Sequence, residues 1–232
     1  MVSKISSLKW ELYNKKKKIL TLFGLKNGHV LPYGDELIKK LRNVYYGGVP
    51  ASIILLSNAM SNGFCYDRAL LMSQAFLDSN DDVNLIYASI DGIRLNPKYA
   101  GSDMEDLMYA DHCIVERITQ DGKSYIYDTS SGFIYEKWFY WLIERPKVRK
   151  VNNKEKISEF INNDLGLISY ENDRYVARII LSFIEDTYGK PTEMYSQIGI
   201  ELLQREIKNY KEKLNDDDMV LKDNTNIRTR SK

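Results

Sequence analysis

The sequence predicts an α+β protein organised around a helix that begins at Cys65. Residues recur there at spacings of four, three and four, which places them on one helical face. They are Cys65, Ala69, Met72 and Phe76. Residues 112–119 and 123–127 read as two strands around a short turn. Beyond about residue 150 the sequence shows helical patterns only, and together these observations predict the α+β class.

The chain is long enough to bury a substantial core. It has 232 residues, of which 44% are hydrophobic and 28% are charged, as in ordinary globular proteins. Its composition changes near residue 150. We expect a core over residues 1–150, a helical extension over residues 151–214 and a disordered polar tail over residues 215–232.

The remaining elements follow from periodicity and from turn residues. We expect helices over residues 5–23 and 35–41, an apolar run of either type over residues 52–56 and a strand over residues 83–90. The aromatic block from Tyr135 to Ile143 is expected to be helical and to end before Pro146. Its side chains suit a buried core, although the same aromatics also suit a surface that binds a peptide or a partner protein.

Charge is distributed unevenly, although the formal net charge is only +1. Residues 1–50 hold ten Lys and Arg against three Asp and Glu, and the densest part of this excess is the lysine run 15–18. Such a run can contact phosphate or anionic lipid, but a solvated helix face explains it more simply. No motif that recognises a base or a phosphate accompanies the run, so we expect no nucleic-acid partner.

Several classes of site lack a motif in this sequence. Two cysteines, at positions 65 and 113, are too few for a disulfide framework. The sequence has no CxxC pair and no HExxH, GxxxxGK[ST] or GxGxxG motif, so we expect no metal and no cofactor. No stretch approaches the ~18 apolar residues of a membrane span, and residues 19–25 do not read as a signal peptide. We therefore expect a protein of the reducing cytoplasm.

Cys65 follows a glycine turn, Asn62-Gly63-Phe64, and lies in the predicted first turn of its helix. Unpaired N–H groups and the positive end of the helix dipole stabilise a thiolate in that position. The thiolate is the nucleophilic form, and such settings lower the pKa of a thiol from about 8.5 to between about 3.5 and about 7.5. The alternative is that Cys65 is a small apolar residue of the core.

A cysteine nucleophile needs a base, and that base needs an acceptor to orient its second ring nitrogen. One of the two histidines, His112, precedes Asp128 by sixteen residues on the predicted hairpin. A two-residue turn would pair His112 with Ser131 and direct Asp128 to the opposite face. A three-residue loop, with Gly122 in the left-handed conformation, would pair His112 with Ser130 and leave Asp128 on the same face. We predict the three-residue loop.

Each of these residues also has a structural interpretation. His112 and Cys113 are adjacent in a strand and point to opposite faces, so we expect Cys113 to be structural. His112 can be a hydrogen-bonded histidine near the rim of the hairpin. Asp128 can be a turn-forming residue before Thr129-Ser130-Ser131.

Three blocks of this sequence resemble the core blocks of the transglutaminase-like superfamily, which belongs to the wider papain-like class. The blocks are Asn62-Gly63-Phe64-Cys65, Asp111-His112-Cys113-Ile114-Val115-Glu116 and Tyr125-Ile126-Tyr127-Asp128-Thr129. The resemblance covers about residues 57–133 and implies a papain-like core in which a cysteine helix packs on an antiparallel sheet. It also implies that Cys65 is the nucleophile, that His112 is the general base and then acid, and that Asp128 orients the imidazole.

The segment Gly63-Phe64-Cys65-Tyr66 also resembles the cysteine block of arylamine N-acetyltransferases. The arginine-glycine-glycine lead-in of that family and the asparagine that follows its cysteine are absent here.

The resemblance implies an enzyme that acts on an amide or acyl carbonyl of a peptide, protein or small substrate through a cysteine nucleophile. Because the sequence shows no site for an acyl acceptor, we expect a hydrolase of peptidase or amidase type. One alternative is an acyltransferase of the transglutaminase or N-acetyltransferase type. Another is a catalytically inactive module that binds a peptide or protein. The backbone N–H of Cys65 is the expected first donor of an oxyanion hole. Papain-like enzymes add an upstream glutamine that is absent here, so the candidates for the second donor are Asn58 and Asn62.

Overall fold

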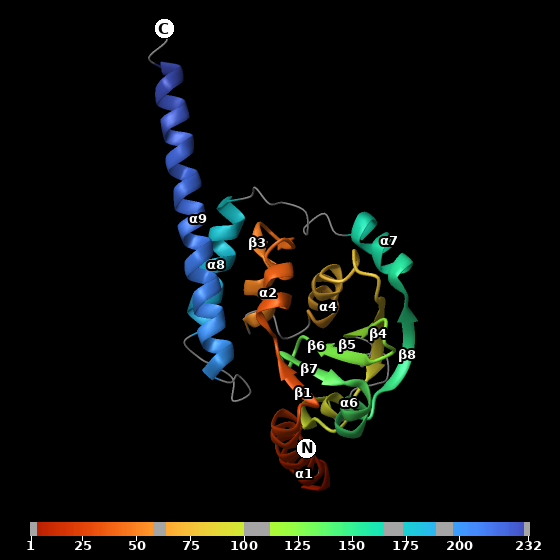
Figure 1. Cartoon of the computed structure of the whole chain (residues 1–232). Coiled ribbons are helices and arrows are strands. Elements are labelled where there is room, and N and C mark those ends of the chain that lie inside the picture. The colour runs from red at the N-terminus through yellow and green to blue at the C-terminus, as the bar shows by residue number, and fades with distance from the viewer. Residues whose placement is uncertain (1–3, 58–63, 100–111, 165–173, 189–196, 230–232) are drawn as a thin grey trace.

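The computed structural model of the chain describes residues 4–57, 64–99, 112–164, 174–188 and 197–229. Within these ranges the protein is an α+β structure with nine α-helices and a six-stranded antiparallel sheet of order β1-β7-β6-β5-β4-β8 (Figure 1). The strands of the sheet are β1 (Val30–Pro32), β4 (Asp82–Ser89), β5 (His112–Ile118), β6 (Ser124–Asp128), β7 (Phe133–Glu136) and β8 (Lys147–Asn152). A separate hairpin consists of β2 (Tyr45–Tyr46) and β3 (Val49–Pro50). The helices are α1 (Lys4–Asn27), α2 (Asp35–Leu41), α3 (Ala51–Leu56), α4 (Cys65–Gln74), α5 (Asp91–Arg94), α6 (Lys137–Glu144), α7 (Lys154–Asp164), α8 (Arg174–Tyr188) and α9 (Gln197–Thr229).

Helices cover both faces of the central strands. α4 packs on one face, where Cys113 and Val115 of β5 belong to the main core. α6 and part of α1 lie against the other face, where Ile114 and Ile126 belong to a second core. Successive residues of β5 therefore enter two different cores, which explains why residues 112–116 are buried without interruption.

The β5–β6 hairpin has the predicted three-residue loop. Its ladder pairs Val115 with Tyr127, and the same register continued places His112 opposite Ser130. Gly122 has a φ of +78°, the left-handed conformation that glycine adopts without a steric cost. The prediction that this loop places His112 and Asp128 on the same face of the hairpin is confirmed.

Helix α1 packs closely against the rest of the molecule at Gly24. A Cβ atom on Gly24 would lie 2.5 Å from a methyl carbon of Val30 and 2.6 Å from the ring of Phe139. The absence of a side chain therefore allows α1 to approach β1 and α6 closely. Tyr13, on the same side of α1, is buried as well.

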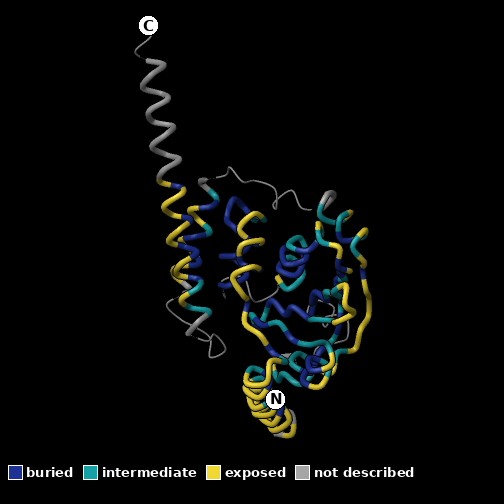
Figure 2. The backbone as a smooth tube through the Cα atoms, viewed as in Figure 1, coloured by how far each residue is buried: buried dark blue, intermediate teal, exposed yellow. Residues whose placement is uncertain are grey.

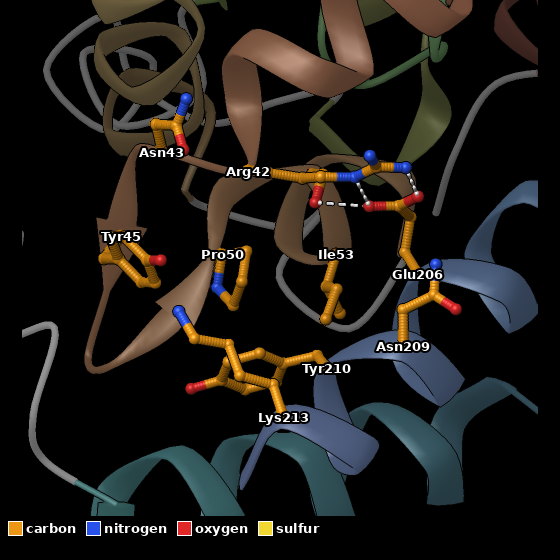
Figure 3. A pocket seen from close by; sticks show the side chains of 10 residues that line it. Arg42, Asn43, Tyr45, Pro50, Ile53, Glu206, Asn209, Tyr210 and Lys213 are labelled. Carbon is orange, nitrogen blue, oxygen red and sulfur yellow. Dashed lines mark hydrogen bonds and ion pairs between the residues drawn. The ribbon is translucent and has the colours of Figure 1, made fainter. Parts of the chain in front are cut away.

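The C-terminal helices pack against the first half of the chain. α8 and α9 lie beside α2, α3 and the β2–β3 hairpin (Figure 1) and share the main core with them. The buried carboxylate of Glu206 in α9 binds the guanidinium of Arg42 at 2.7 and 2.8 Å and accepts a 3.1 Å bond from Ser52. Beside this ion pair, a pocket of about 250 Å³ is lined by side chains such as Asn209 and Lys213 (Figure 3).

The structure differs from the sequence-based expectations in three places. The aromatic block expected as one helix over residues 135–143 begins as strand β7, and α6 starts only at Lys137. Strand β8 crosses the composition boundary, beyond which only helices were expected. Residues 215–229 are helical as part of α9, where a disordered tail was expected. The costly step in helix formation is nucleation, so a long packed helix extends readily into a polar stretch.

Candidate active site

Cys65 is the first residue of α4, and its side chain is half-buried. Burial alone would raise the pKa of its thiol. The hydrogen bond and the charge of His112 oppose this effect, and so do hydrogen bonds from the main-chain N–H groups of Cys113 and Tyr66. Because these interactions outweigh burial, the pKa of Cys65 lies below its ordinary value. The lowered pKa increases the fraction of this side chain that is present as the thiolate.

Cys65 interacts with His112 where the ladder between β5 and β6 has ended. The ladder between β5 and β6 ends at Val115 and Tyr127, whereas β5 itself begins at His112, which still pairs with Ala88 of β4. Residues 112–114 of β5 therefore have no ladder partner on the side of β6. A sulfur that arrives from the α4 face can approach the imidazole here, although the imidazole belongs to the opposite face of the strand.

Asp128 is the last residue of β6 and is buried. Its Oδ1 lies 2.9 Å from Nε2 of His112 and accepts a 3.0 Å bond from the N–H of Ser130. Its Oδ2 accepts a 3.2 Å bond from the hydroxyl of Tyr140. Burial alone would raise the pKa of Asp128, but the charge and the hydrogen bond of His112 hold it far below its ordinary value. Asp128 is thus an ionised acceptor held by three donors.

His112 lies between Cys65 and Asp128. Its Nε2 faces Asp128, so Nδ1 is the ring nitrogen that remains for the sulfur. Burial alone would lower the pKa of His112, but the carboxylate of Asp128 and the thiolate of Cys65 together raise it from 6.5 to about 10. The pKa of the imidazole is raised while that of the thiol is lowered. Both shifts favour a thiolate–imidazolium ion pair.

A second buried polar group supports this site from α1 and α6. The hydroxyl of Tyr13 donates to the carboxylate of Glu144 and lies 2.8 Å from each of its two oxygens, and the same carboxylate forms an ion pair with Lys17. Burial alone would lower the pKa of Lys17, but Glu144, Tyr13 and Asp128 raise it above its ordinary value. The charge of Lys17 in turn helps to hold the pKa of Asp128 down. Helix α1 therefore contributes a cation to the electrostatics of the site.

Arg68, one helical turn beyond Cys65, fixes α4 to its neighbours. Its buried guanidinium donates to three carbonyls at the C-terminal end of α3, at 2.8–3.2 Å. It also donates to the carbonyl of Thr129 at 2.8 Å. Because Thr129 directly follows Asp128, Arg68 holds the cysteine helix against the strand end that carries the carboxylate.

Sequence reasoning did not single out Arg68, Tyr140 or Lys17. A signal for Arg68 was available, because a charge three residues after Cys65 falls near the apolar face of that helix. Tyr140 was visible only as one member of an aromatic block. Nothing in the sequence distinguishes Lys17 from the other lysines of its run.

The predicted oxyanion-hole donors Asn58 and Asn62 lie outside the residues that the structure describes. The N–H of Cys65 is in the first turn of α4, where N–H groups have no partner within the helix. It therefore lies beside the nucleophile, at the position that the first donor of an oxyanion hole occupies.

No metal centre is apparent in the described part of the chain. Within it, no three His, Cys, Asp or Glu side chains converge as the ligands of an ion would. Nδ1 of His29 lies 2.8 Å from Glu136 on β7, and Cys113 points away from His112 into the main core. The described helices also include none that is long and apolar enough to cross a bilayer.

Comparison of the chain with models of protein families, with curated protein sequences and with solved structures gave no match. The fold and the site define an α+β protein in which a thiol, an imidazole and a carboxylate form one hydrogen-bonded chain. The function therefore has to be inferred from the chemistry of Cys65, His112 and Asp128.

Proposed function

We propose that this protein is a cysteine-nucleophile hydrolase of peptidase or amidase type, built on a papain-like, transglutaminase-like core. The observation that carries the proposal is the continuous hydrogen bonding from Cys65 through His112 to Asp128. The arrangement of its parts also supports it, since the cysteine begins a helix that packs on an antiparallel sheet, and the histidine and aspartate lie on adjacent strands.

The second cysteine of the chain provides an internal comparison. Cys113 is buried in the main core, and burial raises its pKa well above the ordinary value. Cys65, on the same sheet-and-helix scaffold, has its pKa lowered. Burial alone therefore does not account for the state of Cys65, whereas the partnership with His112 does. An activated thiol is the property that a nucleophile needs and that a structural cysteine does not.

In the first half of the reaction, the Cys65 thiolate attacks the carbonyl carbon of the substrate, and the C=O π electrons move to the oxygen. The N–H of Cys65 is placed to stabilise the resulting oxyanion. When the tetrahedral intermediate collapses, the C–N bond breaks and the His112 imidazolium gives its proton to the leaving nitrogen. The products of this half are a free amine and a thioester on Cys65.

In the second half, the now neutral His112 takes a proton from water as the oxygen of that water attacks the thioester. The acid leaves, and the thiolate–imidazolium pair is restored. Asp128 accepts a hydrogen bond from Nε2 throughout, so that Nδ1 stays directed at the sulfur and the imidazolium stays stabilised. If a primary amine takes the place of water, the same chemistry becomes acyl transfer.

The direct test is covalent trapping with a peptidyl acyloxymethyl ketone, a probe that alkylates activated active-site thiolates. We expect mass spectrometry to place the adduct on Cys65, and we expect His112→Ala to lose the adduct while remaining folded. Cys113→Ser is the matched control and should retain labelling. If the wild-type protein is folded but is not labelled, the hydrolase proposal is overturned, and a binding module on this fold is the interpretation that remains.

Turnover then distinguishes hydrolysis from transfer. A panel of fluorogenic amides should be hydrolysed by the wild-type protein and not by Cys65→Ala. If product forms only when a primary amine is added, and that amine is found in the product, the protein is an acyltransferase and the hydrolase proposal is overturned.

A further inference from the structure

The outward face of α1 carries an apolar stripe that no other described element covers. Six of its large apolar side chains are between 54% and 67% exposed. They are Ile5, Leu8, Leu12, Ile19, Leu22 and Phe23. Their spacings place them on one helical face, away from Tyr13 and Gly24, which pack on the protein. Figure 2 shows α1 at one end of the molecule, with most of its length exposed.

The surface of α1 is also strongly basic. The helix contains seven lysines and a single acidic residue, Glu11. On an ideal helix, Lys9 and Lys16 border the apolar stripe on one side and Lys18 borders it on the other, while Lys15 and Lys26 lie within it. Long lysine side chains can keep their charge in water while their methylene stems lie on an apolar surface.

The apolar surface continues from α1 onto α6. Trp138 and Leu142, one helical turn apart, are 55% and 46% exposed. The rings of Phe23 and Trp138 both contact the ring of His29, at centroid distances of 6.5 and 4.9 Å. The Nζ of Lys16 donates to the carbonyl of Leu142 at 3.2 Å. An exposed tryptophan at the edge of an apolar, lysine-rich helix is typical of surfaces that enter a lipid headgroup region.

We propose that α1 and the exposed face of α6 bind the surface of a membrane that contains anionic lipids, with α1 lying in the plane of the interface. Charge selects this occupant. A second copy of the chain would bring two basic helices together and bury Lys15 in the contact, where like charges repel. A lipid surface accepts the apolar stripe into its acyl region and pairs the lysines with anionic headgroups. The proposal is independent of the catalytic activity.

The test is co-sedimentation of the full-length protein with vesicles. We expect binding to vesicles of equal parts phosphatidylcholine and phosphatidylglycerol, and little binding to phosphatidylcholine alone. Raising the salt from about 0.1 M to about 1 M shortens the Debye length from about 10 Å to about 3 Å and should weaken the binding. Tryptophan emission should shift to the blue on binding, and Trp138→Phe should lose most of that shift.

Two double variants separate the apolar and electrostatic contributions. Leu12→Glu with Ile19→Glu should abolish binding. Lys15→Gln with Lys18→Gln should weaken it about 25-fold, at about fivefold per lysine near an anionic surface. All four side chains are exposed, so the fold should tolerate these changes.

The matched control is Val148→Glu with Val151→Glu on strand β8, which also replaces two exposed apolar side chains by charges. This control should bind as the wild type does. Equal binding to the two kinds of vesicle, or no binding to either, would overturn the proposal. So would a concentration-dependent dimer that the Leu12→Glu and Ile19→Glu pair abolishes, because the face would then serve self-association.

Discussion

Replacing Asp128 by asparagine removes the charge that keeps His112 protonated and preserves the shape of the side chain. In the native site, interactions with Asp128 and Cys65 overcome burial and raise the pKa of His112 from 6.5 to about 10. At 1.36 kcal/mol per pKa unit, this shift means that the site stabilises the imidazolium by about 5 kcal/mol relative to a free histidine side chain. Without the carboxylate, burial dominates and the ring is neutral at neutral pH. Cys65 then loses its cationic partner, and burial raises the pKa of its thiol above that of the native thiol.

The consequence for thiol reactivity can be estimated from these pKa values. A thiol with an ordinary pKa is only a small fraction thiolate at neutral pH, and the native thiol, whose pKa is lowered, is ionised to a greater extent. A more basic thiolate is also a better nucleophile, by about half a logarithmic unit per pKa unit, which offsets about half of the loss in thiolate on a logarithmic scale. We therefore expect Asp128→Asn to react with iodoacetamide more slowly at neutral pH, by about half a logarithmic unit for each unit by which the pKa of the thiol rises.

The assay measures alkylation rates across pH, with peptide mapping by mass spectrometry to separate Cys65 from Cys113. The midpoint of the Cys65 rate profile should move to higher pH in Asp128→Asn. Cys113 should react slowly in both proteins because it is buried and its pKa is raised. Circular dichroism establishes that the variant is folded. An unchanged rate and midpoint for Cys65 in a folded variant would refute the reasoning, because Asp128 would then have no influence on the thiol.

Three further predictions concern the groups around the reacting atoms. Tyr140→Phe removes the 3.2 Å hydrogen bond to Asp128 and should lower kcat/KM about two- to tenfold, as expected for the loss of one hydrogen bond. The unfolding midpoint should change little. Steady-state kinetics on the best amide substrate measure the effect on kcat/KM. Arg68→Met leaves four buried carbonyls without their donor and should lower the free energy of unfolding by about 3–5 kcal/mol. Urea denaturation measures this change. Unchanged stability would contradict the conclusion that Arg68 holds α4 to its neighbours. The pH profile of kcat/KM should rise through the lowered pKa of Cys65 and fall only near pH 10, where His112 loses its proton, and a fall near pH 6.5 would contradict the assignment.

The hairpin that carries the base was predictable because local chemistry determines it. The alternation of residues 112–119 indicates a strand, and Gly122 favours a three-residue loop. Together they set the register that brings Asp128 beside His112. The position of Cys65 at a helix start was equally local, since the amphipathic pattern in the sequence begins at that residue.

The supporting residues were not predictable because packing between distant segments brings them together. Tyr140 meets Asp128 only after α6 folds onto the sheet, and Lys17 meets Glu144 across 127 positions of the chain. Strand β7 was hidden for a related reason. Its residues, such as Tyr135, are apolar and aromatic enough to suit a helix or a strand, and pairing with β1 and β6 decides between the two.

The central claim, a thiolate–imidazolium pair, can be observed directly by nuclear magnetic resonance of the histidine ring nitrogens. Only His29 and His112 contribute signals, and a His112→Gln spectrum assigns them. At a pH of about 8, well above the pKa of about 6.5 of a free imidazole, the account predicts that both nitrogens of His112 carry protons. It also predicts that Cys65→Ala lowers the pKa of that ring. A neutral His112 at that pH, unaffected by the loss of the Cys65 sulfur, would contradict the account.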